Sequence, residues 1–400
     1  MTHPDVDSSN WKRQLRIILA AQLTVSIGMN LIGPLMPLFI QQLGGVDRGQ
    51  AALWSGIMAG VSGAIMLFMG PIWGTLSDWF GHKRNVLRAI SGTAILISLT
   101  SVIQNPIQLL ISRMMLGAVS GVFPAMQGLI GSVLPRVSLP LGIGLLQAVS
   151  SFGSTVGPLV GGLVTDRASF SVSFIVSGAL IGAGGIVLLM VKEGFHPVPV
   201  PSHSPAQLIK NLKSILSVPG VRRVLLILSL VQLAPNLVSP VFPLVLSAMA
   251  PKAGLATIGL MFTIFGLATT AAAFTSGAIS NKIGAVKLVL AGCVLGGVGA
   301  VAMFFVGSIG LALGIGIILA IATGILVTTA SALLGAATPP DRQGSAFGLV
   351  QSANSIGFGF GPLIGGIIGS LLGLRTPFIF EVGVFALLFI AALTLNKQKL

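Results

Sequence analysis

The sequence predicts an all-α integral membrane protein in which twelve transmembrane helices form two pseudo-symmetric six-helix bundles. Three observations support this prediction. Only 8% of the 400 residues are charged, whereas soluble domains average about 25%. Twelve apolar segments are long enough to cross a bilayer, and sequence landmarks in the first six recur in the last six. Because so few charges cannot solvate the surface of a chain this long, the composition excludes a soluble protein.

The apolar segments fall into two sets of six, separated by one long polar connection. A membrane-spanning helix needs about 20 apolar residues. The segments that reach this length are 15–43, 51–76, 84–104, 107–134, 140–165, 168–191, 222–249, 254–279, 285–307, 309–335, 343–372 and 376–396. We therefore expect a polar leader at 1–14, a first bundle at 15–191, a connection at 192–221, a second bundle at 222–396 and a tail at 397–400.

The net charge of +14 follows from membrane topology rather than from a nucleic-acid partner. An even number of spans places both termini on one side. If that side is the cytoplasm, seventeen basic residues lie in inner segments and four in outer ones, in agreement with the excess of Lys and Arg in cytoplasmic loops. We expect a monomeric, multi-pass protein of the cytoplasmic (inner) membrane, embedded in lipid, with both termini in the cytoplasm.

The connection at 192–221 contains a predicted surface helix. Three prolines favour an extended start, and Ser204-Pro205 supplies a helix N-cap and a first-turn proline. Apolar residues then recur at helical spacing between 208 and 216, with lysines on the flanks. This pattern indicates an amphipathic helix on the inner leaflet that tethers the two bundles; a docking site is the alternative.

Composition also argues against a metal site, a cofactor or an enzyme. The single cysteine, Cys293, lies in an apolar run, which excludes a disulfide framework and a cysteine-based metal site. The four histidines are not paired at ligand spacing. No nucleophile with a matching base is visible. We therefore expect no catalytic residues, no metal and no cofactor.

The loop after the second span combines a carboxylate with basic residues and glycines. Opposite charges at a membrane surface suit a latch between two helices, although a basic loop that only fixes topology has the same composition. A degraded copy at 277–287 keeps the glycines but has Asn281 in place of Asp78, which favours a latch in the first half only. The latch candidates are Gly74, Asp78, Gly81, Lys83 and Arg84.

Two further landmarks indicate an internal duplication. The segment 30–38, with a pair of prolines, returns 206 residues later at 236–244. The Gly-Pro segment 153–162 returns 204 residues later at 357–366. A near-constant offset is the signature of a repeat. Since each repeat has six spans, both halves have the same orientation, which is one known plan of membrane transporters.

The Gly-Pro segments place small residues four apart on one helix face. This spacing allows two backbones to approach closely, and a proline inside the helix permits a bend. Tight packing and a surface along which helices slide during transport are compatible interpretations. The residues are Gly153, Gly157, Pro158, Gly161 and Gly162 in the fifth span, with Gly357, Gly361 and Pro362 in the eleventh.

Polar side chains within the spans define a candidate substrate cavity. Spans one and seven are each interrupted by prolines, and interrupted helices at matching positions of two repeats point to a substrate site. Amides in lipid either bond between helices or line a cavity; beside the prolines, Asn30 and Asn236 favour the cavity. The candidate cavity residues are Gln22, Met29, Asn30, Arg113, Phe123, Met126, Gln127, Gln232, Asn236, Gln351 and Asn354.

Two charged residues, Arg113 and Glu381, lie inside predicted spans. Arg113 lies about one third along span four, and an intramembrane arginine is a functional hypothesis by default. Its side chain could snorkel to the surface, but its depth favours the cavity. Glu381 lies about one turn into span twelve. We favour a carboxyl at the outer interface that pairs with Arg375; the alternative is a proton carrier, because burial favours the neutral carboxyl.

These motifs together resemble the major facilitator superfamily over essentially the whole chain. Gly74-x-Leu-x-Asp78-x-x-Gly81-x-Lys83-Arg84 resembles the signature between its second and third helices. Arg113-x-x-x-Gly117 resembles its helix-four signature, and Gly153-x-x-x-Gly157-Pro158-x-x-Gly161-Gly162 its helix-five antiporter signature. With the Gly-Pro-x-x-Pro of span one, the chain is similar to the twelve-helix drug/proton antiporters that confer antibiotic resistance.

The resemblance implies a secondary active transporter that exports small amphipathic compounds by alternating access in exchange for protons. It implies that Asp78 pairs with the N-terminus of helix eleven and that Arg113 lies near the proton-coupled cavity. Two departures follow. Trp79 stands where the family has a basic residue, and no carboxylate lies in the middle of a span, so neutral or weakly anionic substrates are favoured over cations. The alternatives are an uncoupled metabolite facilitator and a non-transporting sensor or assembly factor.

Overall fold

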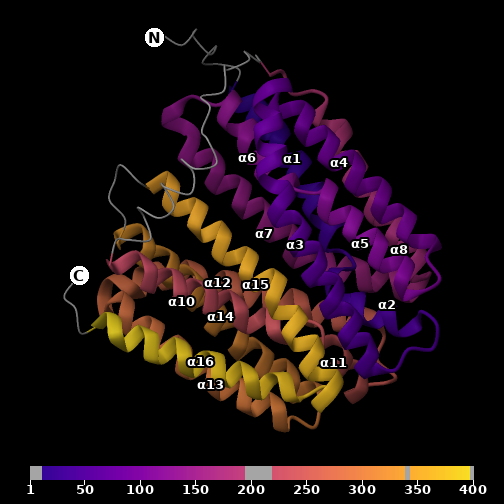
Figure 1. Cartoon of the computed structure of the whole chain (residues 1–400), viewed down its shortest axis with the longest axis vertical. Coiled ribbons are helices and arrows are strands. Elements are labelled where there is room, and N and C mark those ends of the chain that lie inside the picture. Colours follow the sequence, from indigo (N-terminus) through magenta and orange to yellow (C-terminus); the bar gives the residue numbers. More distant parts are fainter. Residues whose placement is uncertain (1–10, 194–218, 338–342, 397–400) are drawn as a thin grey trace. The chain divides into compact units, whose positions relative to one another are not determined.

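The computed structural model describes residues 11–193, 219–337 and 343–396, without the side chains of a few residues inside the helices. All regular elements in these ranges are helices (Figure 1). The first helix begins at Trp11, inside the expected leader. The predicted amphipathic helix of the connection lies outside the described residues.

The chain forms two compact units that exchange short pieces of the two sequence halves. One unit, called unit 1 here, comprises Met1–Met36, Val61–Val200 and Gly254–Thr263. Unit 2 comprises Pro37–Gly60, Pro201–Ala253 and Ile264–Leu400. The units therefore differ from the two expected bundles in that residues 37–60 pack with the second half and residues 254–263 with the first.

The helices of unit 1 come mainly from the first half of the sequence. They are α1 (Trp11–Asn30), η1 (Gly33–Leu35), α3 (Arg48–Phe80, from residue 61 onward), α4 (His82–Leu99), η2 (Thr100–Val102), α5 (Pro106–Val119), α6 (Val122–Val133), η3 (Arg136–Ser138), α7 (Leu139–Arg167) and α8 (Phe170–Leu188). Within this unit α1 packs against both α7 and α8, and α4 packs against α8.

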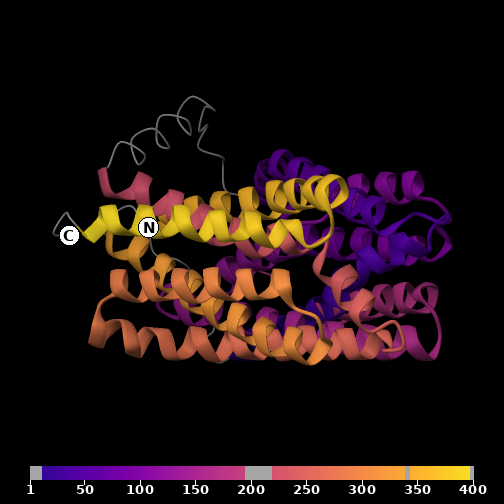
Figure 2. The same ribbon diagram turned by 90° about the horizontal axis from the view of Figure 1, so that it is seen from below.

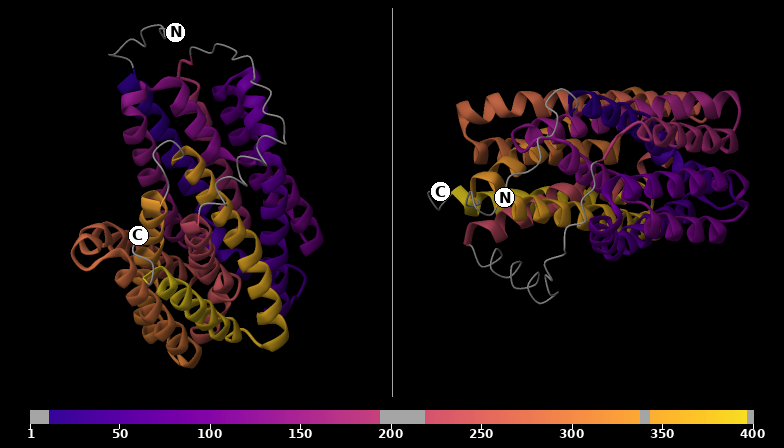
Figure 3. Two further views of the ribbon diagram at one scale, coloured as in Figure 1. Left: turned by 60° about the vertical axis from the view of Figure 1, so that its left-hand side comes forward. Right: turned by 90° about the horizontal axis from the view of Figure 1, so that it is seen from above.

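The helices of unit 2 come mainly from the second half. They are α2 (Met36–Gln42), α10 (Pro219–Val238), α11 (Phe242–Met249), α12 (Leu255–Ile283, from residue 264 onward), α13 (Ala285–Phe305), α14 (Ile309–Ala337), α15 (Gln343–Leu372) and α16 (Thr376–Asn396). Here α10 packs against α15, and α13 packs against α14 and α16. Within each unit the helices lie lengthwise beside one another (Figures 2 and 3).

The predicted membrane spans are largely confirmed. Eleven helical stretches of the described chain are long and apolar enough to cross a bilayer. The remaining predicted span corresponds to α15, in which residues Gly357–Leu372 form a shorter apolar helix. Large apolar side chains such as Phe274 (80% exposed) and Phe305 (73% exposed) lie on the surface of unit 2. Exposed apolar area on this scale is characteristic of a lipid-facing surface.

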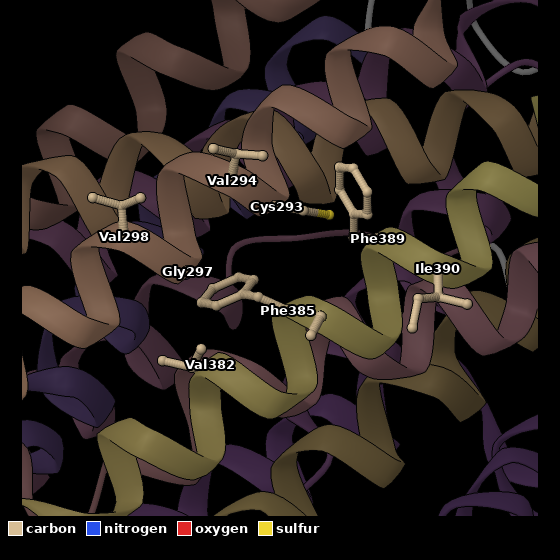
Figure 4. A pocket seen from close by; sticks show the side chains of 9 residues that line it. Cys293, Val294, Gly297, Val298, Val382, Phe385, Phe389 and Ile390 are labelled. Carbon is tan, nitrogen blue, oxygen red and sulfur yellow. The ribbon is translucent and has the colours of Figure 1, made fainter.

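An open apolar groove runs between α13 and α16 on unit 2. Gly297 lacks a side chain, and Cys293, Phe385 and Phe389 form part of the wall (Figure 4). Gly296 on the same helix faces the ring of Phe385, and an added Cβ there would lie 2.6 Å from its Cζ. The small residues of α13 therefore allow an aromatic side chain of α16 to pack against its backbone.

Helix breaks occur where prolines remove backbone donors. In span one α1 ends at Asn30, a short 3-10 turn from Gly33 to Leu35 contains Pro34, and α2 follows from Met36. In span seven α10 ends at Val238 and α11 begins at Phe242. Proline has no N–H and clashes with the preceding turn, which interrupts the ladder. Both predicted interruptions are therefore present.

Span four contains a break that the apolar pattern does not indicate. α5 ends at Val119, and α6 begins at Val122. Between them Gly121 has φ 108°, in the region that only glycine adopts easily. The predicted continuous span at 107–134 is thus two helices joined by a two-residue turn.

The duplication is visible in backbone geometry at the two loop motifs. Gly81, before α4, has φ 98° and ψ 144°. Gly284, before α13, has φ 91° and ψ 141°. Their N–H groups donate to Ser77 O and Ser280 O, each at 2.9 Å. The two halves therefore use the same glycine-dependent turn, although the second copy lacks the acidic residue.

Candidate functional site

The Gly-Pro face of α7 packs directly on α1 in unit 1. A Cβ added at Gly157 would lie 3.0 Å from the carbonyl carbon of Asn30. At Gly161 it would overlap the carbonyl oxygen of Leu31. Gly153 faces Ser26 in the same way. Only glycine fits at these positions, because the facing atoms belong largely to backbone that cannot move aside.

Unit 2 repeats this packing between α15 and α10. A Cβ at Gly357 would lie 2.8 Å from the carbonyl carbon of Gln232, and one at Gly361 would lie 2.7 Å from Asn236 Cβ. Gly365 faces the carbonyl oxygen of Leu237 with no room for a side chain. The geometry fits the packing interpretation of the motif in both halves, and a role in sliding stays a prediction.

The amides beside the prolines hydrogen-bond to their own helices. Asn30 Nδ2 donates to Ser26 O at 2.9 Å, and Asn236 Nδ2 donates to Gln232 O at 2.7 Å. Both asparagines are half-buried. These bonds satisfy the amide donors, while the side chains lie against the glycines of the neighbouring helix. Whether they also line a cavity stays a prediction.

Gln22 forms a polar bridge between α1 and α7. Its Nε2 donates to Ser26 Oγ at 2.9 Å and to Ser150 Oγ at 2.8 Å. Gln22 is 4% exposed, and its Oε1 has no hydrogen-bond partner in the described structure. Of the two interpretations that the sequence left open, Gln22 therefore fits hydrogen bonding between helices, with its Oε1 left without a donor.

The other cavity candidates differ in exposure. Met29 is 37% exposed, whereas Met126 is fully buried within unit 1. The side chain of Gln351 lies outside the described residues. Half-buried candidates are Phe123, Gln127, Gln232 and Asn354. Because Met126 presents no surface, its contribution here is to the core of unit 1.

Arg113 lies on α5 without a carboxylate partner among the described residues. Its Nη2 is 3.7 Å from Met36 Sδ, and its buried Nε has no hydrogen-bond partner. The backbone around it is fixed, since Ser62 Oγ donates to Arg113 O at 3.0 Å. Gly117, one turn later, lets α3 approach: an added Cβ would lie 3.1 Å from Ser62 Cα.

The basic loop is tied to α8 within unit 1. Lys83 Nζ donates to the carbonyl oxygens of Leu189 and Val191 at 2.9 and 2.6 Å. The carboxylate of Glu193 accepts from the backbone N–H groups of His82 and Lys83 at 3.0 and 2.9 Å. Lys83 therefore caps the C-terminal end of α8, and Glu193 caps the N-terminal end of α4.

The remaining latch candidates are less constrained. Arg84 and Gly74 are exposed, and a side chain added at Gly74 would meet open space. The side chain of Asp78 lies outside the described residues. Its pairing with helix eleven therefore stays a prediction, and the close approach that motivated the glycine at Gly74 is not formed within unit 1.

Trp73 and Arg88 form a cluster that the sequence motifs do not indicate. The Arg88 guanidinium lies 3.3 Å from the centre of the Trp73 ring. Arg88 Nη1 donates to Val119 O at 2.8 Å, and Trp73 Nε1 donates to Ala118 O at 2.7 Å. The pair thus satisfies carbonyl groups at the C-terminus of α5, next to the break in span four. The available signal was an aromatic residue, Trp73, directly before the basic loop motif.

Glu381 is buried, which corrects the favoured interpretation of this residue. Its side chain is 3% exposed, and its Oε2 has no hydrogen-bond partner in the described chain. The expected ion pair with Arg375 is not formed. Arg375 Nη1 instead donates to Phe304 O at 3.3 Å. The carboxyl faces inward because it shares a helix face with buried Phe378 and Leu388.

Two contacts join helices from opposite sequence halves, each inside one unit. In unit 1 the start of α12 lies on α7: a Cβ at Gly162 would lie 2.8 Å from Ala256 Cα. Thr263 Oγ1 donates to Thr155 O at 2.8 Å in the same interface. We call this the α7–α12 contact. It explains why residues 254–263 belong to the unit formed by the first half.

In unit 2 the start of α3 lies on α15. A Cβ at Gly56 would lie 3.1 Å from Gly366 Cα, and one at Gly60 would lie 3.2 Å from Gly359 O. We call this the α3–α15 contact. Both contacts involve the second helix of one repeat and the fifth helix of the other, so they are the two equivalent contacts that the duplication generates.

Comparison with known proteins agrees with this architecture. The model of the Major Facilitator Superfamily matches residues 18–250 and, separately, residues 224–399. Multidrug resistance protein MdtG of Escherichia fergusonii is 29% identical over 382 residues, covering 93% of this chain and 92% of the relative. MdtG of Enterobacter lignolyticus is 30% identical over 378 residues, covering 92% and 89%.

Solved structures show the same fold at lower identity. A bacterial homologue of the human lysosomal transporter Spinster, in an inward-facing and occupied conformation, superimposes with a TM-score of 0.79 at 15% identity over 96% of each chain. The human organic anion transporter MFSD10 gives a TM-score of 0.68 at 17% identity, covering 98% of this chain and 100% of that one. At these identities the likeness concerns the fold alone.

Proposed function

We propose, from the premise that this chain belongs to the major facilitator superfamily, that it exports small amphipathic compounds by alternating access in exchange for protons. The premise makes the chain a multi-pass membrane transporter and not an enzyme. The relatives named multidrug resistance proteins favour efflux. The charge pattern supports an orientation with both termini in the cytoplasm of a cell whose inner membrane holds the protein.

The observation that best supports a polar substrate site is the environment of Arg113. The guanidinium lies in a membrane-spanning helix, its Nη2 lies 3.7 Å from the sulfur of Met36, and its Nε has no hydrogen-bond partner in the described structure. Arg113 is half-buried, and a cation without a counter-ion inside a membrane-spanning helix is costly. A weakly anionic or neutral hydrogen-bonding ligand lowers this cost, whereas a cationic ligand raises it. We therefore infer a preference for neutral or weakly anionic amphiphiles.

Glu381 is the candidate proton carrier. It is a carboxyl buried inside a membrane-spanning helix of unit 2, and its Oε2 has no hydrogen-bond partner in the described chain. A group in this position exchanges a proton only when solvent reaches it, so its protonation can depend on conformation. Arg113 and Glu381 belong to different units, and the proposal requires each to respond to the same transport cycle.

Transport into proteoliposomes tests the proposal directly. A panel of anionic, neutral and cationic amphiphiles is measured with and without an imposed pH gradient. Wild type should move weakly anionic and neutral compounds uphill when the gradient is present. Arg113→Ala should lower the rate for the anionic compounds about tenfold to hundredfold, since a charge-assisted contact contributes about 1.5–3 kcal/mol. Arg167→Ala, an exposed basic residue at the end of α7, is the matched control.

Glu381→Gln separates coupling from transport. The amide keeps the size of the side chain but cannot carry a proton, so uphill movement should be lost while downhill exchange continues. A substrate profile dominated by lipophilic cations would contradict the role of Arg113, and unchanged uphill transport by Glu381→Gln would contradict the role of the carboxyl.

An uncoupled facilitator is the second candidate function, because no carboxylate occupies the middle of a predicted span. It predicts transport that an imposed pH gradient cannot drive uphill in wild type. A non-transporting sensor predicts no flux for any compound of the panel. The same experiment therefore distinguishes all three.

A further inference from the structure

Helix α12 begins without a capping side chain of its own. The first N–H groups of a helix have no partner within it and need an external acceptor. The residue before Leu255 is Gly254, which has no side chain to provide one. The acceptor comes instead from Asp166, in the last turn of α7. Its Oδ1 accepts from Leu255 N at 2.7 Å, and its Oδ2 accepts from Ala256 N at 2.8 Å.

The glycine at 254 makes room for this carboxylate. A Cβ added there would lie 2.9 Å from Asp166 Cγ. Gly254 is not among the glycines with positive φ, so the backbone itself does not require glycine. Space for Asp166 is therefore the structural reason for the missing side chain, and any larger residue would displace the carboxylate from the helix end.

The carboxylate lies at one end of a continuous interface. Successive turns of α7 meet α12 through Gly162 on Ala256, through the carbonyl of Pro158 on Gly259, and through Thr155 with Thr263. The first two are backbone-to-backbone approaches, and the third is a buried hydrogen bond. Asp166 adds two charge-assisted bonds where this interface reaches the surface.

We propose that Asp166 is a positioning residue that holds the α7–α12 contact closed by capping α12 from the opposite helix. The N–H groups of Leu255 and Ala256 have this acceptor only while the two helices touch. When the helices separate, the helix end and the carboxylate both lose their partner and must be solvated. The cap therefore biases the contact toward its closed state.

Closure of this contact is one half-step of the proposed alternating access, and to that extent the inference rests on the proposed function. The closed state itself is measurable without a substrate. Failure to transport any compound would contradict the proposed function and leave the cap unaffected, whereas an unchanged contact in the variants below would contradict the cap alone.

Thiol accessibility provides the measurement. In a Cys293→Ala background, Thr155→Cys places one thiol in the interface, at a position that is 6% exposed. The backbone oxygen at 155 that accepts from Thr263 remains in place. Labelling by a water-soluble maleimide in proteoliposomes then reports how often the contact opens. Asp166→Ala should raise the labelling rate about twofold to thirtyfold, the range that corresponds to loss of a helix cap.

A second cap in the chain supplies the matched control. Asp47 precedes α3 and accepts from Gln50 N at 2.8 Å, within its own helix. Asp47→Ala removes a cap of the same chemistry without touching the α7–α12 contact, so labelling at 155 should not change. Asp166→Asn should give an intermediate rate, because the amide oxygen accepts one bond and its nitrogen accepts none.

The double variant Asp166→Ala with Gly254→Ser tests whether the cap must come from the opposite helix, α7, or whether any cap on α12 suffices. Serine at 254 can cap α12 within the helix, and the space it needs is free once Asp166 is shortened. If a cap that comes from α7 is required to hold the contact closed, labelling remains fast in the double variant. Return of labelling to the wild-type rate, or unchanged labelling in Asp166→Ala, would overturn the proposal.

Discussion

The α7–α12 contact and the α3–α15 contact occupy equivalent positions in the two repeats, yet the helix that begins at each contact is capped in a different way. Both pack small residues backbone to backbone, through Gly162 and Gly259 in one and Gly56 and Gly366 in the other. They differ at the helix start. α3 is capped by Asp47 from its own chain segment, whereas α12 is capped across the contact by Asp166.

The difference has a local cause. The residue 204 positions after Asp166 is Ser370 in α15. Its carbonyl oxygen lies 3.5 Å from where a Cβ at Gly49 would be, so α15 approaches α3 with backbone and not with a carboxylate. The two halves thus share close packing, and among the described residues a charge-assisted bond is added to it in unit 1. Packing and polar closure can therefore be altered separately.

The largest effect is expected from adding a side chain at a glycine in each of the two contacts. Gly259→Val and Gly56→Val should each open their own contact, because the new side chain meets the Pro158 or Pro362 carbonyl. Overpacking costs about 1–3 kcal/mol or more, which corresponds to a rise in thiol labelling of about fivefold to more than about a hundredfold. Thr155→Cys reports on the first contact and Ala52→Cys, fully buried, on the second.

Gly182→Val and Gly314→Val are matched controls for these two variants. Each places the same side chain on a helix of unit 1 or unit 2 where an added Cβ meets open space. Labelling should stay at the wild-type rate in both. If Gly56→Val left Ala52→Cys protected while Gly259→Val exposed Thr155→Cys, the two contacts would not be equivalent and the comparison would fail.

The membrane spans, the helix breaks at the paired prolines and the close packing of the glycines of α7 and α15 could be predicted from the sequence. Hydrophobic length predicts spans because a bilayer fixes helix length, and paired prolines predict breaks because they remove donors. The glycine motifs of 153–162 and 357–366 predicted close approach, and Gly157 and Gly361 are indeed in backbone contact with α1 and α10. These signals are local, so one sequence contains them completely.

The hydrogen bonds that Asp166 and Glu193 accept could not be predicted from the sequence, because each joins residues that are far apart in the chain. Asp166 is 89 residues from Leu255, and Glu193 is 111 residues from His82. Both carboxylates lie in segments that read as exposed connections, where charge is unremarkable. The error at Glu381 has the same origin: its position near a helix end suggested the interface, but the helix face on which it lies is buried.

A middle-sized effect is expected from the buried hydrogen bond of unit 1. Thr263→Val removes the donor to Thr155 O while keeping the shape of the side chain. A bond of this kind contributes about 1 kcal/mol, so labelling at Thr155→Cys should rise about fivefold. Thr257→Val, on an exposed face of the same helix, is the control. Equal labelling in the two variants would show that glycine packing alone closes the contact.

The smallest effect is expected from Asp47→Ala on its own contact, and it tests the comparison most sharply. Asp47 caps α3 whether or not α15 is near, since its acceptor and donor belong to the same helix start. Its loss should speed hydrogen exchange at the amide of Gln50 but change labelling at Ala52→Cys by less than about twofold. A cap stabilises by about 0.5–2 kcal/mol, and here that free energy cancels between the open and closed contact. A rise at Ala52→Cys as large as Asp166→Ala causes at Thr155→Cys would mean that any weakened helix end opens these contacts, and the position of the capping residue on one helix or the other would then make no difference.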